Sequence, residues 1–214
     1  MHGRRGFLLL LLVSVAAVGS MAAAPASQPA AEAQGAADHS SPEKTWATLC
    51  AAVNRGDVNA FRACFSNRNE ISTLFLEAFS DLTVTTFQLA NATADLGEEG
   101  KAISARLATT YTDVVKNGEG RKTEISGEEA SWTKTVHTAT GDGENSIYFR
   151  HVHGEWLIDT AESYNLNSAA GRKAAEDMME ATGPQVKKFK EIIEAIKTKK
   201  ITTVDQMRAK LEEK

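Results

Sequence analysis

Apolar and polar residues alternate along residues 144–162, on both sides of the dipeptide His153-Gly154. Runs rich in β-branched and aromatic residues that flank a two-residue loop with glycine second predict a β-hairpin. The loop sets the register, so His151 is expected opposite Trp156. Successive side chains point to opposite faces of the hairpin.

The two faces of this hairpin differ in character. The first is mostly apolar and carries Ile147, Phe149, His151, Trp156, Ile158 and Thr160. The second is mixed and carries Tyr148, Arg150, Val152, Leu157 and Asp159. We therefore expect the first face to contribute to the core.

A second turn signal, Gly141-Asp142-Gly143, precedes the hairpin and predicts a third strand over residues 131–139. A two-residue Asp-Gly loop would pair Gly141 with Glu144. Carried along the strands, this register places Val136 beside Phe149, with Trp132 also on the apolar face.

Helix signals begin at Ser41, which can cap a helix whose first position tolerates Pro42. Apolar residues then recur at helical spacing until Gly56, which can end the helix in a left-handed conformation. Asp57 can cap a second helix. We expect helices over residues 42–55, 58–65 and 70–79.

The periodicity changes after Asp81, where β-branched residues become frequent. The pattern predicts two long strands over residues 84–95 and 102–115, and a loop over residues 117–129. Because helices come first and strands follow, we expect an α+β fold in which N-terminal helices pack against a curved antiparallel sheet.

The C-terminal residues again predict helices, over residues 169–182, 186–200 and 204–214, with the first break at Gly183-Pro184. The middle segment carries an apolar stripe of Phe189, Ile192, Ile193 and Ile196.

The charges of the two regions are opposite in sign. Residues 42–165 contain 11 Lys+Arg and 18 Asp+Glu, a net charge of −7, whereas residues 166–214 contain 11 and 8, a net charge of +3. Opposite charges favour a tail that folds back on its own domain, although each surface pair contributes little. Docking on a partner or on a membrane surface is the alternative.

The N-terminus has the layout of a secretory signal peptide, with Arg4 and Arg5 before an apolar run and then small residues. The run is shorter than the roughly 20 residues that span a membrane. An uncleaved N-terminal anchor is the alternative. We expect a signal peptide over residues 1–23, a flexible linker over 24–41, an α+β domain over 42–165 and a helical extension over 166–214. The mature protein would be periplasmic or extracellular, without a transmembrane segment.

Export also bears on Cys50 and Cys64, each of which lies seven residues from Asp57. A chain that folds back at Gly56-Asp57 could bring the two thiols together in an oxidising compartment. Packed helices usually lie about 8–10 Å apart, whereas a disulfide needs Cα atoms within about 7 Å. A disulfide and a reduced buried pair therefore both remain open.

Three features together carry a family resemblance. The first predicted helix ends in AAVNRGD (residues 51–57), the next contains Phe61, and the closing strand begins GEWLID (residues 154–159). This combination is similar to the nuclear transport factor 2-like superfamily, which includes polyketide-cyclase-like, ketosteroid-isomerase-like and scytalone-dehydratase-like proteins. The resemblance covers residues 41–162.

The resemblance implies a sheet wrapped around helices into a cone, often with an interior pocket and often in a homodimer. Such folds host enzymes and binding modules alike, and no catalytic motif of the enzymatic members matches residues of this chain. The expected pocket lining comprises Trp46, Trp132, Phe149, His151 and Trp156. Such a lining suits a small apolar molecule but offers few groups that move protons.

The sequence is therefore compatible with two functions. A non-catalytic domain would bind a small apolar molecule or a protein partner. A small isomerase, cyclase or dehydratase would need an acid or base in the pocket, where His151 is the central candidate.

A polar row provides the alternative site, because the expected register places His137 beside Tyr148 and Asp159 on the mixed face. These residues have the ingredients of acid–base chemistry, although an ordinary polar sheet face would look the same. The alternation of His151 and His153 resembles a pair of metal ligands, but two ligands do not complete a site, so no metal or cofactor is expected. The chain lacks the aromatic-interleaved basic surface of nucleic-acid binders.

Overall fold

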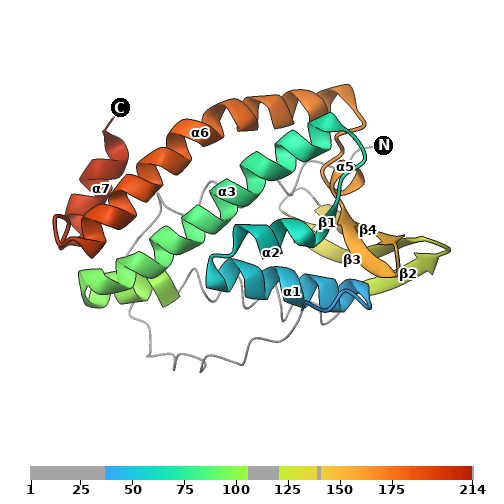
Figure 1. Cartoon of the computed structure of the whole chain (residues 1–214), viewed down its shortest axis with the longest axis horizontal. Helices are drawn as coiled ribbons and strands as arrows, with labels where there is room; N and C mark the ends of the chain where they lie inside the picture. The colour runs from blue at the N-terminus through green and yellow to red at the C-terminus, as the bar shows by residue number, and fades with distance from the viewer. Residues whose placement is uncertain (1–36, 106–120, 139–140, 214) are drawn as a thin grey trace.

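The computed structural model describes residues 37–105, 121–138 and 141–213 (Figure 1). It confirms the expected α+β fold, with helices at both ends of the described region and an open five-stranded sheet between them. The predicted signal peptide and most of the predicted linker lie outside the described residues. Within the described part of the chain, no helix is both long and apolar enough to cross a membrane.

The first two helices begin where the capping signals predict, but the second ends at Ala63 instead of the predicted Phe65, which pairs with Ile158 in the sheet. Helix α1 spans Pro42–Arg55, and the Ser41 hydroxyl accepts from the backbone N–H of Lys44. Gly56 ends α1 with a φ of 69°, in the left-handed region that glycine adopts without strain. Helix α2 spans Val58–Ala63 and is capped by the Asp57 side chain.

The last residues of the predicted linker are already part of the fold. Asp38 forms an ion pair of 2.9 Å with Lys44 of α1. His39 is buried, and its carbonyl oxygen accepts from the backbone N–H of Trp156 at 2.8 Å. The ordered domain therefore begins before residue 42.

The strand predicted over residues 84–95 is wrong. Helix α3 spans Glu70–Ala92 and continues into the 3-10 helix η1, Thr93–Leu96. Its apolar residues Leu76, Val84 and Phe87 are buried in the main core, at spacings that place them along one side of a helix. Burial of this side outweighs the β propensity of individual residues, which depends strongly on context.

The second predicted long strand, over residues 102–115, is also wrong where the structure describes it. Residues 98–105 are helical, and residues 106–115 lie outside the described residues. A strand, β2 (Lys122–Ser126), replaces part of the loop predicted over residues 117–129.

The sheet has the order β1-β5-β4-β3-β2. The other strands are β1 (Phe65–Ser66), β3 (Glu129–Thr138), β4 (Gly141–Val152) and β5 (Glu155–Asp159). Strand β1 runs parallel to β5, and all other neighbours are antiparallel.

The β4–β5 hairpin has the predicted register, with His151 opposite Trp156. Both turn residues have positive φ, 52° at His153 and 90° at Gly154, as the tight turns of twisted hairpins require.

The predicted register between β3 and β4 is wrong. Thr138 pairs with Gly141, so the turn signal Gly141-Asp142-Gly143 lies within β4. Val136 lies opposite Gly143 instead of beside Phe149, and Trp132 lies opposite Ile147. The predicted and observed registers differ by an even number of residues, so Trp132 stays on the apolar face, as predicted. The observed register places Trp132 and Ile147 together in the main core.

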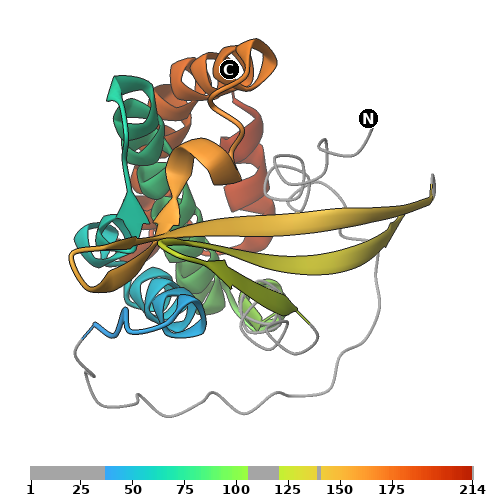
Figure 2. The same ribbon diagram turned by 90° about the vertical axis from the view of Figure 1, so that its right-hand side faces the viewer.

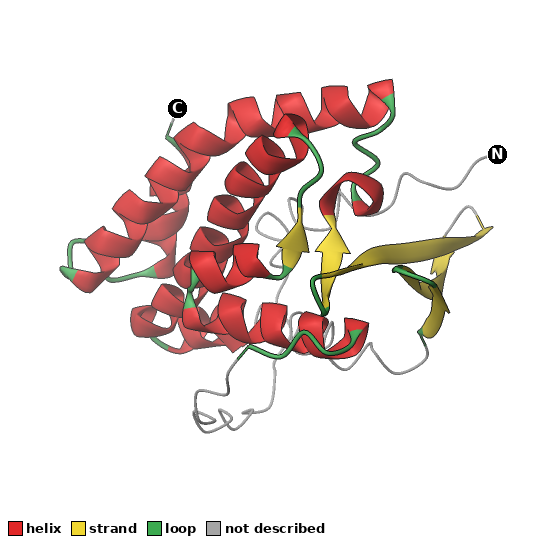
Figure 3. Ribbon diagram, turned by 45° about the vertical axis from the view of Figure 1, so that its right-hand side comes forward, coloured by secondary structure: helices red, strands yellow, loops and turns green. Residues whose placement is uncertain are grey.

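Helices cover both faces of the sheet. Helix α1 lies on one side, and α5 (Thr160–Ser163) lies on the other (Figures 2 and 3). The main core forms between the apolar sheet face and helices α1, α2 and α3. Its largest contributors are Phe61, Phe65, Phe87, Trp132, Phe149 and Ile158.

The C-terminal helices pack on α3, which confirms the predicted fold-back. Helix α6 spans Ala169–Lys197 and runs alongside α3, and α7 spans Val204–Glu212 (Figure 1). The predicted stripe of Phe189, Ile192, Ile193 and Ile196 forms a second core cluster with Leu89 and Leu96. The apolar stripe of α6 is thus buried against residues of the same chain.

The helix break predicted at Gly183-Pro184 is wrong, because α6 is continuous through Pro184. A proline inside a helix typically costs about 3 kcal/mol. Thr182 and Val186, on either side, are buried, and this packing holds both halves of the helix in one direction.

Candidate functional site

The predicted ligand lining is a packed core. Trp132 and Phe149 are only 2% and 1% exposed, and their ring centroids lie 6.4 Å apart. Trp46 of α1 contacts Trp132 edge-on, with ring centroids 5.8 Å apart. The structure therefore brings three of the five predicted lining residues together, but in contact with one another.

The space left beside these residues is small. A cavity of about 20 Å³ is lined by Trp46, Ser146, Ile147, Ile158, Ser163 and Tyr164. A single water needs about 10–15 Å³, whereas ligand pockets usually measure about 300–1,000 Å³. The cavity holds one water at most.

The other two predicted lining residues, His151 and Trp156, are half-buried at the hairpin end of the sheet. Their ring centroids lie 5.0 Å apart, so His151 is a rim residue beside Trp156. The backbone N–H of His151 donates to the carbonyl oxygen of Glu128 at 2.8 Å. Trp156 packs against the edge of the main core.

The predicted polar row does not form. His137 lies opposite Asp142, whereas Tyr148 lies opposite Ser131, six residues further along β3. At about 3.3 Å per residue, His137 and Tyr148 are about 20 Å apart along the strand. The side chain of His137 lies outside the described residues, and the backbone N–H of Tyr148 donates to the Ser163 hydroxyl at 3.0 Å.

Asp159 instead belongs to a cluster with two arginines. Its side chain is only 2% exposed, and one carboxylate oxygen caps α5 by accepting from the backbone N–H of Glu162 at 3.1 Å. The other oxygen accepts from Arg68 Nη2 and lies 3.5 Å from Arg150 Nε. The buried carboxylate is thus offset by two guanidinium groups.

Glu129 completes this arginine cluster on its outer side. Its Oε1 atom lies 3.4 Å from Arg150 Nη2 and 3.9 Å from Arg68 Nη2. We define the arginine cluster as Arg68, Glu129, Arg150 and Asp159. Sequence reasoning missed Arg68 and Glu129, since the first is positioned by the parallel pairing of Ser66 with Asp159 and the second lay in a predicted loop.

Cys50 and Cys64 are both buried and both free in the structure. Burial raises the pKa of each thiol to about 12. The neighbouring Cys50 thiol contributes to the raised pKa of Cys64, after burial.

Thiol labelling at pH 8 should therefore modify neither cysteine in the folded protein and both after denaturation without reductant. At a pKa of about 12 only about one thiol in ten thousand is ionised at pH 8, and the thiolate is the reactive form. Mass spectrometry after alkylation counts the modified residues. Fewer than two labelled thiols in the denatured chain would indicate a disulfide.

Strand β2 lies at the edge of the sheet, and all five of its residues are exposed. Ile125 lies opposite Ala130, which lies opposite Phe149, so Ile125 continues the apolar row of the sheet to its edge. Ile125 is nevertheless 59% exposed. On the same face, the Thr123 hydroxyl donates to Glu43 of α1 at 2.6 Å.

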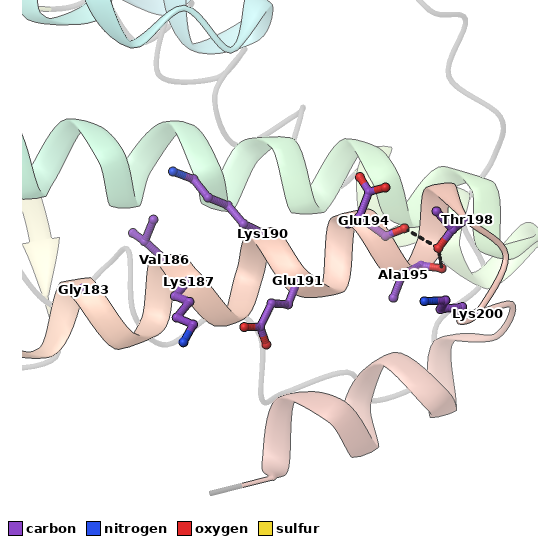
Figure 4. A pocket seen from close by; sticks show the side chains of 9 residues that line it. All are labelled: Gly183, Val186, Lys187, Lys190, Glu191, Glu194, Ala195, Thr198 and Lys200. Carbon is purple, nitrogen blue, oxygen red and sulfur yellow. Dashed lines mark hydrogen bonds between the residues drawn. The ribbon is translucent and has the colours of Figure 1, made fainter.

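A groove runs along α6 (Figure 4). Its lining is mixed in charge, with Lys187 and Lys190 beside Glu191 and Glu194, and these side chains point in different directions. It therefore lacks the convergent polar groups of a specific site. Among the residues whose side chains the structure describes, no three His, Cys, Asp or Glu residues could hold a metal ion.

No protein-family model, curated protein or solved structure matches the chain. The resemblance to the nuclear transport factor 2-like superfamily therefore stays a prediction, and the case for function depends on the geometry of this molecule.

Proposed function

We propose that the chain is an exported, non-catalytic domain that binds a protein partner, and that an extended segment of the partner adds to the edge of the sheet at β2. The signal-peptide pattern that begins with Arg4 and Arg5 supports export. Strand addition is a common mode of recognition, in which backbone hydrogen bonds provide affinity and alternate side chains provide specificity.

The exposure of β2 carries this proposal. Long exposed edges promote pairing with other chains, and native proteins usually cover or charge them. Within residues 37–105, 121–138 and 141–213, only β3 pairs with β2. An added strand would cover Ile125 and extend the row formed by Ala130 and Phe149. Full burial of such a side chain contributes roughly 1.5–3 kcal/mol.

The packing of the interior makes the other candidate functions less favourable. A small apolar ligand would have to displace Trp46 or Trp132 from their mutual contact. An acid–base enzyme needs a titratable group beside a substrate-sized space, whereas His151 lies on the rim and Asp159 is held by arginines.

A photo-reactive amino acid at position 125 tests the partner contact. In the compartment to which the protein is exported, we expect one defined cross-linked protein with the probe at position 125. The matched control is position 74, because Leu74 is also a large exposed apolar residue, 45% exposed, but lies on α3. Equal cross-linking from both positions would contradict the proposal.

Hydrogen exchange tests the edge itself. Alternate backbone N–H groups of residues 122–126 point away from β3 and should exchange rapidly in the isolated protein. They should become protected when the identified partner binds. Strong protection of every β2 amide in the isolated monomer would show that the edge is already covered, and the proposal would fail.

A further inference from the structure

We propose that Arg68 and Arg150 form a binding site for a carboxylate group, and that Glu129 occupies this site in the unliganded protein. The two arginines of this site are not on the proposed β2 edge, since Arg150 lies on β4 and Arg68 precedes α3, although Glu129 pairs with Ser126 of β2.

The two guanidinium groups converge on one point. Arg68 Nη2 and Arg150 Nη2 both face the Oε1 atom of Glu129, at 3.9 and 3.4 Å. Charge-assisted hydrogen bonds between arginine and carboxylate are usually about 2.7–2.9 Å long, and they are often bidentate. Glu129 reaches both arginines with one oxygen and at longer distances, so its contacts are weaker than those that a bidentate carboxylate could make.

The Glu129 side chain is also held only weakly between the two arginines. Its side chain is 66% exposed. Exposed ion pairs of this kind contribute about 0–1 kcal/mol, because solvent screens them and long side chains lose entropy when fixed. A ligand carboxylate that engages both guanidinium groups can therefore replace it at little cost.

The two arginines, in contrast, are held in place by a buried carboxylate. Asp159 is buried and contacts both of them, and Arg150 projects from a central strand of the sheet. A donor pair that is already positioned loses little entropy when it binds. The two side chains remain 36% and 37% exposed, so a ligand can reach them.

The charge of the arginine cluster selects the class of ligand. Two guanidinium groups and the carboxylate of Asp159 leave one net positive charge, which Glu129 now balances. A monovalent carboxylate restores this balance, whereas a divalent phosphate would leave one negative charge in excess. We therefore assign the site to a carboxylate, from an acidic side chain or from a chain terminus.

The test is a titration of the nitrogen-15-labelled protein, followed by the Nε–H resonances of Arg68 and Arg150. N-acetylglycine presents a main-chain carboxylate, and N-acetylglutamic acid α-amide presents a side-chain carboxylate. We expect saturable shifts of both resonances with at least one probe, and the tighter probe identifies the source. Inorganic phosphate should bind more weakly.

The variant Glu129→Gln removes the competing carboxylate and should tighten binding of the better probe by about three-fold. Glu128→Gln is the matched control, because it removes the same charge one position away. Arg62 provides an internal control, since it pairs with a single carboxylate, Asp81, at 2.9 Å.

Three results would overturn the assignment. The first is the absence of saturable shifts in both the native protein and Glu129→Gln. The second is equal tightening by Glu128→Gln and Glu129→Gln, which would indicate a general charge effect. The third is phosphate binding at least as tight as that of either carboxylate probe.

Discussion

Deletion of residues 164–214 is expected to leave no stably folded domain. Phe189, Ile192 and Ile196 of α6 are buried against α3, where they cover Leu89. Each fully buried side chain of this size contributes roughly 1.5–3 kcal/mol. Several such losses approach the total stability of a typical domain, about 5–15 kcal/mol. Circular dichroism and size-exclusion chromatography of the truncated protein would measure the outcome.

A shorter deletion provides the control. A chain that ends at Lys200 lacks α7 and loses the buried residues Val204 and Met207, but it keeps all of α6. It should fold with reduced stability. If the chain that ends at residue 163 is monomeric and melts at the same temperature as the full chain, the helices do not support the domain and serve another purpose.

The substitution Trp132→Ala should destabilise the protein by about 3–5 kcal/mol, as is typical when a large aromatic residue is removed from a core. Trp132 is almost fully buried between Trp46 and Phe149. Arg121 also lies 4.9 Å from its ring centroid, and this cation–π contact would be lost as well. Chemical denaturation followed by circular dichroism would give the change in the free energy of unfolding.

His151→Ala is the matched control for this substitution, because His151 is on the same sheet face but half-buried at the rim. Its loss should cost less than about 1 kcal/mol, near the usual range for surface positions. A small effect of Trp132→Ala would mean that the interior tolerates an open space. In that case a ligand pocket between α1 and the sheet would again be a reasonable interpretation.

Features that depend on residues close together in the sequence were predictable from the sequence. Ser41 and Asp57 cap helices because each side chain accepts from a backbone N–H three positions along the chain. His153-Gly154 forms the predicted turn because few backbone conformations reverse a twisted hairpin in two residues.

The candidate site was less predictable. The sequence placed aromatic residues on the correct sheet face, but whether that face surrounds a cavity depends on how closely α1 packs against it. Here Trp46 reaches Trp132, and the cavity that the described residues leave beside them is only about 20 Å³. The arginine cluster joins Arg68 to Asp159, 91 positions apart, through a two-residue parallel strand that carries no periodic signal.

The sequence by itself therefore determined the fold class, the caps, the β4–β5 hairpin and the apolar stripe of α6. In each of these, the interacting residues lie within a few positions or share one periodic pattern. Only the tertiary structure decided that residues 84–92 are helical, that α6 continues through Pro184, and that Trp132 pairs with Ile147. In these three places local propensity favours one conformation and burial against distant elements favours another, and burial contributes more free energy.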